Sequence, residues 1–213
     1  MTNKKEILLI GGGGHCKSCI EVIESTNLYS IAGILDTPDK LGDLVLGYPI
    51  IGNDNDLKLL KKKYDYALIT VGQIKSPKIR INLFNVAKNL GFQFPVIIAS
   101  TAHVSKNSSI GEGTVIMHQA LINSEVTIGK NNIINSKALI EHDCSIGDNN
   151  HISTGAILNG TVSILDDTFV GSGTVVNHGI TIASKCIISS NSLVRKSLKQ
   201  YGIYSGSPLK KIK

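Results

Sequence analysis

Tryptophan is absent from this 213-residue chain, and aromatic residues make up only 5% of it. Single-stranded nucleic acids are usually bound on stacked aromatic side chains, which this chain has in short supply. The formal net charge of +6 comes from basic residues that are mostly scattered, apart from Lys61–Lys63 and the C-terminal Lys210–Lys213. Scattered basic residues are typical of a solvated surface that attracts small anions. The composition therefore disfavours nucleic acid as a partner.

Cysteines and long apolar runs are also scarce. Of the four cysteines, only Cys16 and Cys19 lie close together in sequence. Redox use of such a pair needs a thioredoxin-like context, which is absent here, so buried free thiols are expected. The first apolar run, Ile7–Ile10, is too short for a signal peptide or a membrane span. We therefore expect a cytoplasmic protein with no membrane insertion.

An aliphatic residue recurs at every sixth position through the C-terminal half, from Val104 to Val194 without interruption. A period of six fits neither a helix nor a simple alternating strand. It fits a coil of short strands in which one β-branched side chain per strand points to a central axis. Gly, Asn or Ser often follows the aliphatic residue, and these residues tolerate the positive φ of tight corners. The repeat therefore predicts a parallel β-helix.

The N-terminal half opens with a pattern typical of a strand, a glycine loop and a helix. Parallel strands with crossover helices place their carboxyl ends, and the loops that follow them, along one edge of a sheet. The expected elements are strands over residues 5–10, 31–35 and 66–71 and helices over residues 15–25 and 76–91.

Two features at this expected edge favour a nucleotide ligand. The run Gly11–Gly14 would let phosphates approach backbone N–H groups at a helix N-terminus. Asp36, at the end of the second strand, could hydrogen-bond a ribose or a base. The run lacks the third glycine of the dinucleotide fingerprint, and three strands are too few for a full dinucleotide fold. NAD is therefore the weaker interpretation.

Two histidines in the repeat region are candidates for chemistry. His142 and His151 flank inward aliphatic positions and so should project outward from the coil, facing a groove. A nucleophile such as an amine needs a base to remove its proton, and histidine titrates near neutral pH. Either Asp143 or Glu141 could hold the tautomer of His142 and raise its basicity.

The remaining histidines of the repeat region, His103, His118 and His178, receive no role. Their spacing, taken with that of His151, matches no known ligand signature, so no metal site is expected.

The chain resembles the hexapeptide-repeat acyltransferases, and most of all the UDP-4-amino-sugar (bacillosamine-type) N-acetyltransferases, with the sialic acid O-acetyltransferases as close relatives. Residues 7–15, 34–36, 72, 140–155 and 204–212 carry the likeness. The last of these fits the family's closing Gly-x-Pro-x-Lys pattern at Gly206, Pro208 and Lys210.

The resemblance implies an α/β, Rossmann-like nucleotide-binding domain over residues 1–94, followed by an all-β left-handed parallel β-helix that binds acetyl-CoA over residues 95–213. It also implies a homotrimer, in which acetyl-CoA lies in the groove between two prisms.

Roles for individual residues follow from the same resemblance. His142 would be the general base, tuned by Asp143. The residues implied for acetyl-CoA are His151, Ser172 and Ser190. The residues implied for the sugar nucleotide are Gly13, Gly14, His15, Asp36, Thr37 and Gly72.

The expected reaction is direct transfer of acetyl from acetyl-CoA to the 4-amino group of a UDP-linked 4-amino-4,6-dideoxy sugar, for the synthesis of a surface glycan. Two alternatives remain. One is O-acetylation of sialic acid or a related sugar, which is distinguished by whether a nucleotide occupies the N-terminal loop. The other is a non-catalytic sugar-nucleotide-binding protein, whose function would survive loss of His142.

Overall fold

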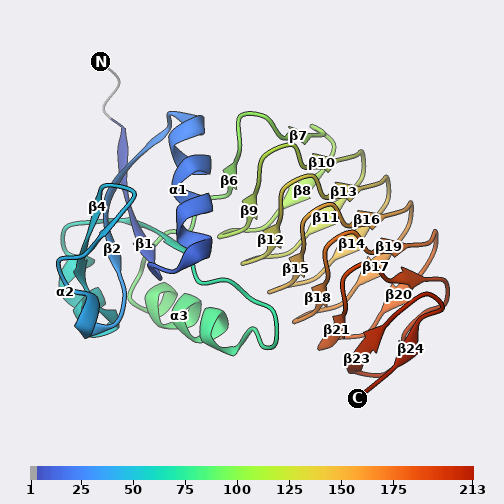
Figure 1. Cartoon of the computed structure of the whole chain (residues 1–213). Helices are drawn as coiled ribbons and strands as arrows, with labels where there is room; N and C mark the ends of the chain where they lie inside the picture. Colours follow the sequence, from blue (N-terminus) through green and yellow to red (C-terminus); the bar gives the residue numbers. More distant parts are fainter. Residues whose placement is uncertain (1–3) are drawn as a thin grey trace. The chain divides into compact units, whose positions relative to one another are not determined.

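The computed structural model describes residues 4–213, which form two compact units (Figure 1). The α/β unit comprises the chain up to Gly72 together with Lys78–Ser100. The β-helix unit comprises Gln73–Pro77 and Thr101–Lys213. The short segment Gln73–Pro77 thus belongs to the β-helix unit, although the α/β unit flanks it on both sides in sequence.

The α/β unit is built on a sheet with the strand order β3-β4-β2-β1-β5. Its main strands pair in parallel, and only β3 runs antiparallel to its neighbour β4. The strands are β1 (Lys5–Ile10), β2 (Tyr29–Leu35), β3 (Leu44–Val45), β4 (Tyr48–Gly52) and β5 (Tyr66–Ile69), with β6 (Ile97–Ile98) near the end of the unit. The helices are α1 (Gly14–Thr26), α2 (Leu57–Leu60) and α3 (Lys78–Asn89), with 3-10 turns η1 (Pro38–Lys40) and η2 (Asp54–Asp56).

The sheet packs on a core that the helices complete. Leu8, Ile10 and Leu35 of the central strands form one cluster with Leu57 of α2 and Phe84 of α3. Burial of such side chains stabilises the unit by about 25 cal/mol for each Å² of apolar surface removed from water. Among residues 4–213, no helix is both long and apolar enough to cross a membrane.

The expected strand–loop–helix start is confirmed, but the expectation of only three strands is wrong. The segment Tyr48–Gly52 forms β4, which pairs with β2 through Ile34 and Ile50. Pro49 and Gly52 make this segment read as a turn, because proline cannot donate to a strand ladder and glycine weakens strands. Pro49 is tolerated because it precedes the first residue pair of the β2–β4 ladder, Ile34 and Ile50, so its missing N–H removes no hydrogen bond of that ladder.

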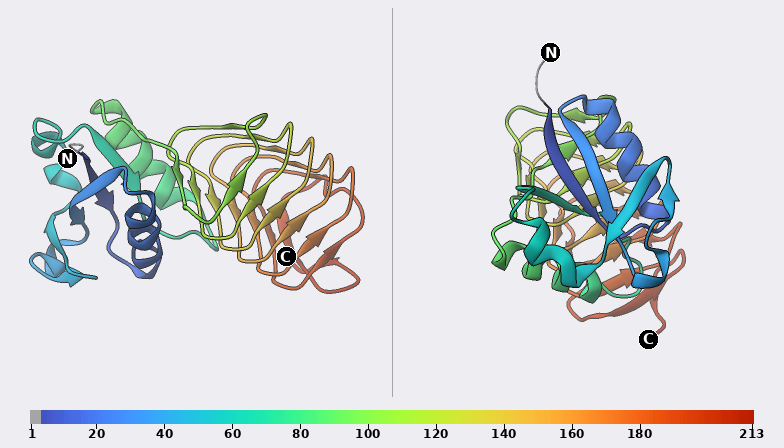
Figure 2. Two further views of the ribbon diagram at one scale, coloured as in Figure 1. Left: turned by 90° about the horizontal axis from the view of Figure 1, so that it is seen from above. Right: turned by 90° about the vertical axis from the view of Figure 1, so that its left-hand side faces the viewer.

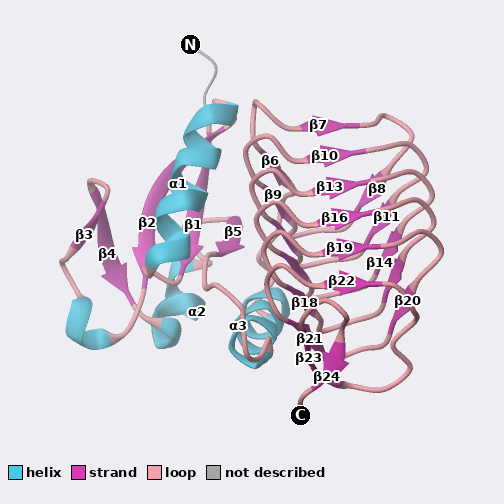
Figure 3. Cartoon of the chain, turned by 45° about the vertical axis from the view of Figure 1, so that its right-hand side comes forward, coloured by secondary structure: helices cyan, strands magenta, loops and turns pink. Residues whose placement is uncertain are grey.

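The β-helix unit consists of three parallel sheets made of very short strands (Figures 2 and 3). Sheet 1 contains β7 (His103–Val104), β10 (Leu121–Ile122), β13 (Leu139–Ile140), β16 (Ile157–Leu158), β19 (Val175–Val176) and β22 (Leu193–Val194). Sheet 2 contains β8 (Ser109–Ile110), β11 (Thr127–Ile128), β14 (Ser145–Ile146), β17 (Ser163–Ile164) and β20 (Thr181–Ile182). Within this unit, sheet 3 contains β9 (Val115–Ile116), β12 (Ile133–Ile134), β15 (His151–Ile152), β18 (Phe169–Val170), β21 (Cys186–Ile188), β23 (Gly202–Ser205) and the antiparallel β24 (Lys210–Lys211).

The register of these sheets confirms the predicted left-handed β-helix. Partners are separated by 18 residues, or three hexapeptides, as in the pair Ile122 and Ile140. The repeated aliphatic residues point inward, and from Ile116 to Val194 all of them are buried. The outward residue of each strand is the one before, so each sheet presents a regular column of side chains.

Polar side chains also form ladders inside this coil. The backbone N–H of Asn150 donates to Oδ1 of Asn132 at 2.7 Å, and the N–H of Thr168 donates to Oδ1 of Asn150 at 2.8 Å. These residues occupy positions where small side chains are common in the repeat. Because a buried backbone donor without a partner is costly, the amides stabilise the coil where the sheets are interrupted.

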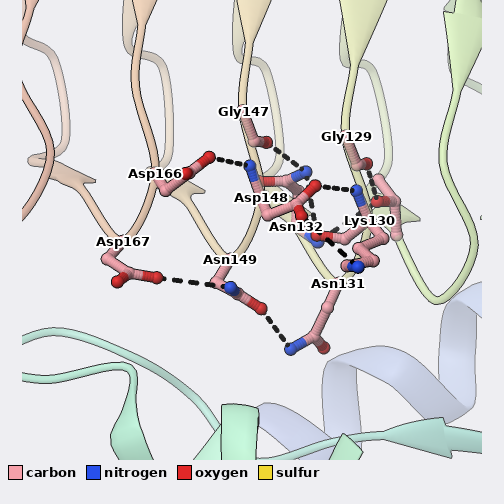
Figure 4. A network of polar contacts seen from close by, with 10 residues as sticks. Gly129, Lys130, Asn131, Asn132, Gly147, Asp148, Asn149, Asp166 and Asp167 are labelled. Atoms are coloured by element: carbon pink, nitrogen blue, oxygen red, sulfur yellow. Dashed lines mark hydrogen bonds and ion pairs between the residues drawn. The ribbon is translucent and has the colours of Figure 1, made fainter. Parts of the chain in front are cut away.

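A second ladder runs along the outside of the corner between sheets 2 and 3 (Figure 4). Oδ1 of Asp148 accepts from the N–H of Lys130 at 2.9 Å, and Oδ1 of Asp166 accepts from the N–H of Asp148 at 2.7 Å. Beside them, the Asn131 amide donates to Asn149 at 2.9 Å. Each step spans 18 residues, so these side chains connect successive turns of the coil.

Candidate functional site

A hollow of about 370 Å³ lies in the α/β unit, at the carboxyl edge of its sheet. Asp36 and Thr37, which were expected to bind the sugar nucleotide, both line it. Gly11 of the glycine loop also lines it, together with polar residues of η2. Its full lining is Ile10, Gly11, Leu35, Asp36, Thr37, Pro38, Asn53, Asp54, Asn55, Val71, Ile79 and Leu83.

Asp36 connects the second strand to the glycine loop. Its Oδ2 accepts the N–H of Gly12 at 2.7 Å, and its Oδ1 accepts the N–H of Thr37 at 2.7 Å and the ammonium of Lys40 at 3.1 Å. Burial favours the neutral carboxyl, but the hydrogen bonds from Thr37, Lys40 and Gly12 outweigh it and lower the pKa of Asp36. An ionised Asp36 therefore fixes the position of the loop.

The other residues expected to bind the sugar nucleotide lie around the start of α1. Gly13 is the N-cap residue of the helix, and a Cβ added at Gly13 or Gly14 would meet no atom within 4 Å. A Cβ on Gly72 would lie 3.5 Å from Cβ of His15, so these two residues are neighbours. Nε2 of His15 lies 3.5 Å from Sγ of the buried Cys19. None of these four residues lines the hollow that contains Asp36.

Two groups that support this edge have no local signal in the sequence. The buried guanidinium of Arg80 in α3 donates to the carbonyls of Ile69, at 2.9 Å, and Val71, at 2.7 Å. Between them, the hydroxyl of Thr70 donates to the carbonyl of Gly11 at 2.6 Å. The end of β5 is thus attached to both α3 and the glycine loop.

The sequence also showed no sign of Asp54 and Asn55 of η2, nor of its N-cap residue Asn53, because the strand that leads to them was missed. Burial, and then the charge of nearby Asp36, raises the pKa of the Asp54 carboxyl. Asp54 and Asn55 of η2 line the same hollow as Asp36.

In the β-helix unit, His142 and Asp143 form a pair at the corner between sheets 1 and 2. Nδ1 of His142 lies 2.6 Å from Oδ2 of Asp143, and both side chains are 53% exposed. Asp143 has a φ of 59°, which turns the chain so that two adjacent side chains meet. Of the two carboxylates considered, Glu141 instead accepts from the amide of Asn123 at 2.9 Å. Asp143 is thus the partner of His142.

A second hollow, of about 540 Å³, brings together the three residues expected to contact acetyl-CoA, namely His151, Ser172 and Ser190. It lies along sheet 3 and the corner between sheets 3 and 1. We call this corner, which carries Ser153 and Ser172, the serine corner. The full lining is Ile74, Asn135, His151, Ser153, Phe169, Ser172, Ile187, Ser189 and Ser190.

The hydrogen bonds of His151 define its tautomer. Oδ1 of Asn135 accepts the N–H of Ser136 at 2.8 Å, which turns the amide Nδ2 of Asn135 toward Nε2 of His151 at 3.1 Å. Nε2 must therefore accept, and Nδ1 carries the proton that it donates to the carbonyl of Gln73 at 2.6 Å. His151 projects outward as expected, but it is only 7% exposed.

The pair His142–Asp143 and the second hollow lie at two different corners of the coil. The first corner, residues 141–144, joins β13 to β14 and is called here the His142 corner. Both it and the serine corner border sheet 1. From β10 to β22, the outward residues of sheet 1 form an apolar face, which consists of Leu121, Leu139, Ile157, Val175 and Leu193. Those of sheet 2 are Ser109, Thr127, Ser145, Ser163 and Thr181.

The cysteines take no part in either hollow. All four are free and buried, as expected from the sequence. Burial raises the pKa of Cys16, and that of Cys144, to about 11 in each case, so both thiols are protonated near neutral pH. Within residues 4–213, no three His, Cys, Asp or Glu side chains come together in a group that could hold a metal ion.

Comparisons with known proteins agree with this architecture. Residues 6–87 match the family described as PglD N-terminal domain, and residues 125–160 match bacterial transferase hexapeptide, six repeats. No curated protein gives a significant match to the sequence.

The solved structures that are similar over the whole chain include two coenzyme A complexes. One is PerB from Caulobacter crescentus in complex with CoA and GDP-perosamine, with 30% identity, a TM-score of 0.90, and coverage of 100% of this chain and 99% of that one. The other is the acetyltransferase domain of PglB from Neisseria gonorrhoeae in complex with acetyl coenzyme A, with 27% identity, a TM-score of 0.89, and coverage of 99% and 100%.

Proposed function

The chain belongs to the hexapeptide-repeat sugar acyltransferase family and is an acetyl-CoA-dependent sugar N-acetyltransferase, and we propose that its acceptor is the 4-amino group of a nucleotide-linked 4-amino-4,6-dideoxy sugar. The similarity to PerB, whose structure holds GDP-perosamine, supports a sugar nucleotide as the acceptor. UDP as the nucleotide stays a prediction, as does a cytoplasmic location.

The observation that carries the catalytic proposal is the His142–Asp143 pair. Because Asp143 accepts the proton on Nδ1, Nε2 of His142 is left with its lone pair directed away from the carboxylate. We propose that Nε2 takes the proton from the amine as it attacks the thioester carbonyl. His142 then returns this proton to the CoA thiolate that leaves when the tetrahedral intermediate collapses. No covalent enzyme intermediate is needed.

For acetyl-CoA we propose the second hollow. His151, Ser172 and Ser190 line it together, and Ile74 and Phe169 add apolar surface. Serine hydroxyls and apolar side chains suit the amides and methylene groups of a pantetheine chain. The Nε2 atom of His151 is already bonded to Asn135, so His151 would contribute to this hollow as part of a fixed network.

For the sugar nucleotide we propose the carboxyl edge of the α/β sheet, within the domain of residues 1–94, with acetyl-CoA assigned to the domain of residues 95–213. Asp36 and Thr37 line the hollow there. Gly13 and Gly14 leave open space at the N-terminal end of α1, with His15 and Gly72 next to each other nearby. Backbone N–H groups at such a position favour phosphates.

We further propose that the protein acts as a homotrimer, because one copy does not bring the His142 corner and the serine corner together. The apolar face of sheet 1 lies between these two corners. In a ring of three copies with this face toward the axis, the His142 corner of one copy adjoins the serine corner of the next. Burial of the apolar face would then stabilise the assembly that completes the site.

The experiment that tests the function is thiol release from acetyl-CoA with a panel of UDP- and GDP-linked 4-amino sugars, free sialic acid and its nucleotide form. We expect turnover of an amino-sugar nucleotide, and a fall in kcat of about 10²- to 10⁴-fold in His142→Ala. Turnover of sialic acid alone would replace the proposal with O-acetylation. Nucleotide binding without any thiol release would identify a non-catalytic sugar-nucleotide-binding protein.

A further inference from the structure

Three residues occupy the same position in successive turns of the coil, 18 residues apart: His142, Gly160 and His178. The backbone confirms that these corners stack. The N–H of Thr161 donates to the carbonyl of His142 at 3.0 Å, and the N–H of Gly179 donates to the carbonyl of Gly160 at 3.1 Å. The glycine therefore lies between two histidines along the edge of the coil.

The two imidazole rings reach toward each other across this glycine. A Cβ on Gly160 would lie 2.8 Å from Nε2 of His142 and 3.2 Å from Nδ1 of His178. Because both nitrogens lie this close to one point, they are separated by about 6 Å at most, a range over which two ionisable groups influence each other. Any side chain at position 160 would occupy the space that the rings share.

In one tautomer of His178, the facing nitrogens of both rings are acceptors. Nδ1 of His142 is engaged with Asp143, so the lone pair of Nε2 is available. Nε2 of His178 lies 3.4 Å from the hydroxyl of Thr161. When Nε2 of His178 donates to that hydroxyl, Nδ1 carries the other lone pair, on the side of Gly160. Two proton acceptors thus border one space.

We propose that His178 is a second proton acceptor of the acetyl-transfer site, which removes the first proton from an amine substrate that binds as its ammonium ion. This inference rests on the proposed N-acetyltransferase function. An ammonium group must lose one proton before it can attack, and the attacking nitrogen must lose a second proton afterwards. A single base cannot hold both protons at once.

With two bases, every proton of the acetyl-transfer reaction is accounted for. The ammonium passes one proton to Nδ1 of His178, and the free amine forms a C–N bond to the thioester carbonyl. Nε2 of His142 takes the second proton, and the C–S bond breaks. The CoA thiolate recovers the proton from His142, and His178 loses its proton to solvent, where its exposed ring can exchange it. The products are the amide, the CoA thiol and one proton.

Charged and titratable groups surround His178 on both sides along the coil. His142 and Asp143 precede it by two turns, and Arg195 and Lys196 follow it by about one turn. The acid limb of the pH profile will therefore reflect the whole group. Only a comparison between variants that each lack a single histidine isolates the contribution of His178 to this acid limb.

The test is the pH dependence of kcat/KM in His178→Gln, with His118→Gln as the matched control. His118 is likewise a corner histidine, half-buried, that contacts a threonine 17 residues earlier, Thr101, at 2.8 Å. We expect His178→Gln to lower kcat/KM for the amino-sugar nucleotide by about 10²-fold near pH 6.5, and by less than about 3-fold near pH 8.5, where free amine is abundant. His118→Gln should match the wild type at both values.

Either a loss that is equal at all pH values or no loss at all would overturn the proposal. A fold defect is recognised separately, because circular dichroism and the affinity for acetyl-CoA would change with it, and His178→Asn then repeats the test. If the wild-type protein turns over no amino-sugar nucleotide, it is the proposed function that fails. If the wild type is active and the acid limb of His178→Gln is unmoved, only this inference fails.

Discussion

The carboxylate of Asp36 accepts a hydrogen bond from the backbone N–H of Gly12 at 2.7 Å, which joins the end of β2 to the glycine loop that follows β1. The two residues are 24 positions apart in sequence. Their hydrogen bond fixes the carboxyl ends of β1 and β2 relative to each other. The N–H of Thr37 and the ammonium of Lys40 bond to the same carboxylate. A single ionised group therefore holds together one side of the hollow.

Asp36→Asn should lower the free energy of unfolding at neutral pH, because an amide is a weaker acceptor for these donors and lacks the charge that pairs with Lys40. The folded-state pKa of Asp36 is lowered from its ordinary value of 3.8, so ionisation stabilises the folded state above that value. The contribution is lost as the pH falls through the lowered pKa. Urea denaturation at several pH values should therefore show a difference between wild type and variant that shrinks in acid; a constant difference would contradict this account.

Asp143→Asn should lower kcat by about ten-fold or more while the KM for acetyl-CoA stays unchanged, because the amide does not stabilise a protonated His142. Asparagine is the suitable replacement, since Asp143 has a φ of 59° and asparagine tolerates this region well. Steady-state kinetics with both substrates varied separates the two effects. An unchanged kcat would show that the 2.6 Å contact does not tune the base.

Gly13→Ala should raise the KM for the sugar nucleotide by about ten-fold, or 1.4 kcal/mol, with little effect on folding. The φ of −77° suits alanine, and a Cβ there meets no protein atom within 4 Å, so only a ligand would meet the methyl group. Loss of a glycine N-cap costs about 1 kcal/mol or less.

The neighbouring Gly12→Ala is the contrast for this prediction. Its Cβ would lie 2.8 Å from Oδ2 of Asp36 and 3.3 Å from Cδ1 of Ile50, so this variant should lower the melting temperature instead. Equal KM values in wild type and Gly13→Ala would place the phosphates elsewhere.

The repeat region was predictable because its information is local and repeated. A two-residue strand and a tight corner recur in each hexapeptide, so the inward positions such as Ile122 and Ile140 can be read directly from the period. The α/β unit was less predictable, since Pro49 and Gly52 obscured β4 and, with it, the polar residues of η2. Only tertiary pairing with β2 makes that segment a strand.

The candidate site likewise combines features that are local in the sequence with features that depend on tertiary packing. The spacing of 18 residues between His142, Gly160 and His178 is visible in the sequence once three hexapeptides are taken as one turn. By contrast, the bond from His151 to the carbonyl of Gln73 joins residues 78 positions apart, and nothing near either residue signals it. The contact of Arg80 with the carbonyls at the end of β5 is likewise set by the packing of α3.

The proposed homotrimer leads to a separate prediction. Leu139→Arg, within the apolar face, should convert a trimer into monomers, because a buried unpaired charge opposes the contact between copies. Ser145→Arg places the same charge on the polar column of sheet 2 and should leave the trimer intact. Light scattering gives the mass of each. A trimer that survives Leu139→Arg would exclude this face as the interface.

Mixed trimers test whether two copies share one site. His142→Ala removes the base, and Ser172→Trp fills the hollow at the serine corner, so each variant alone should be inactive. If His142 of one copy faces the serine corner of the next, co-expression creates some sites in which both halves are intact, and thiol release returns. A site contained in one copy could not be rescued in this way, because each chain would keep its own defect. Recovery of activity would thus show that catalysis takes place between two copies.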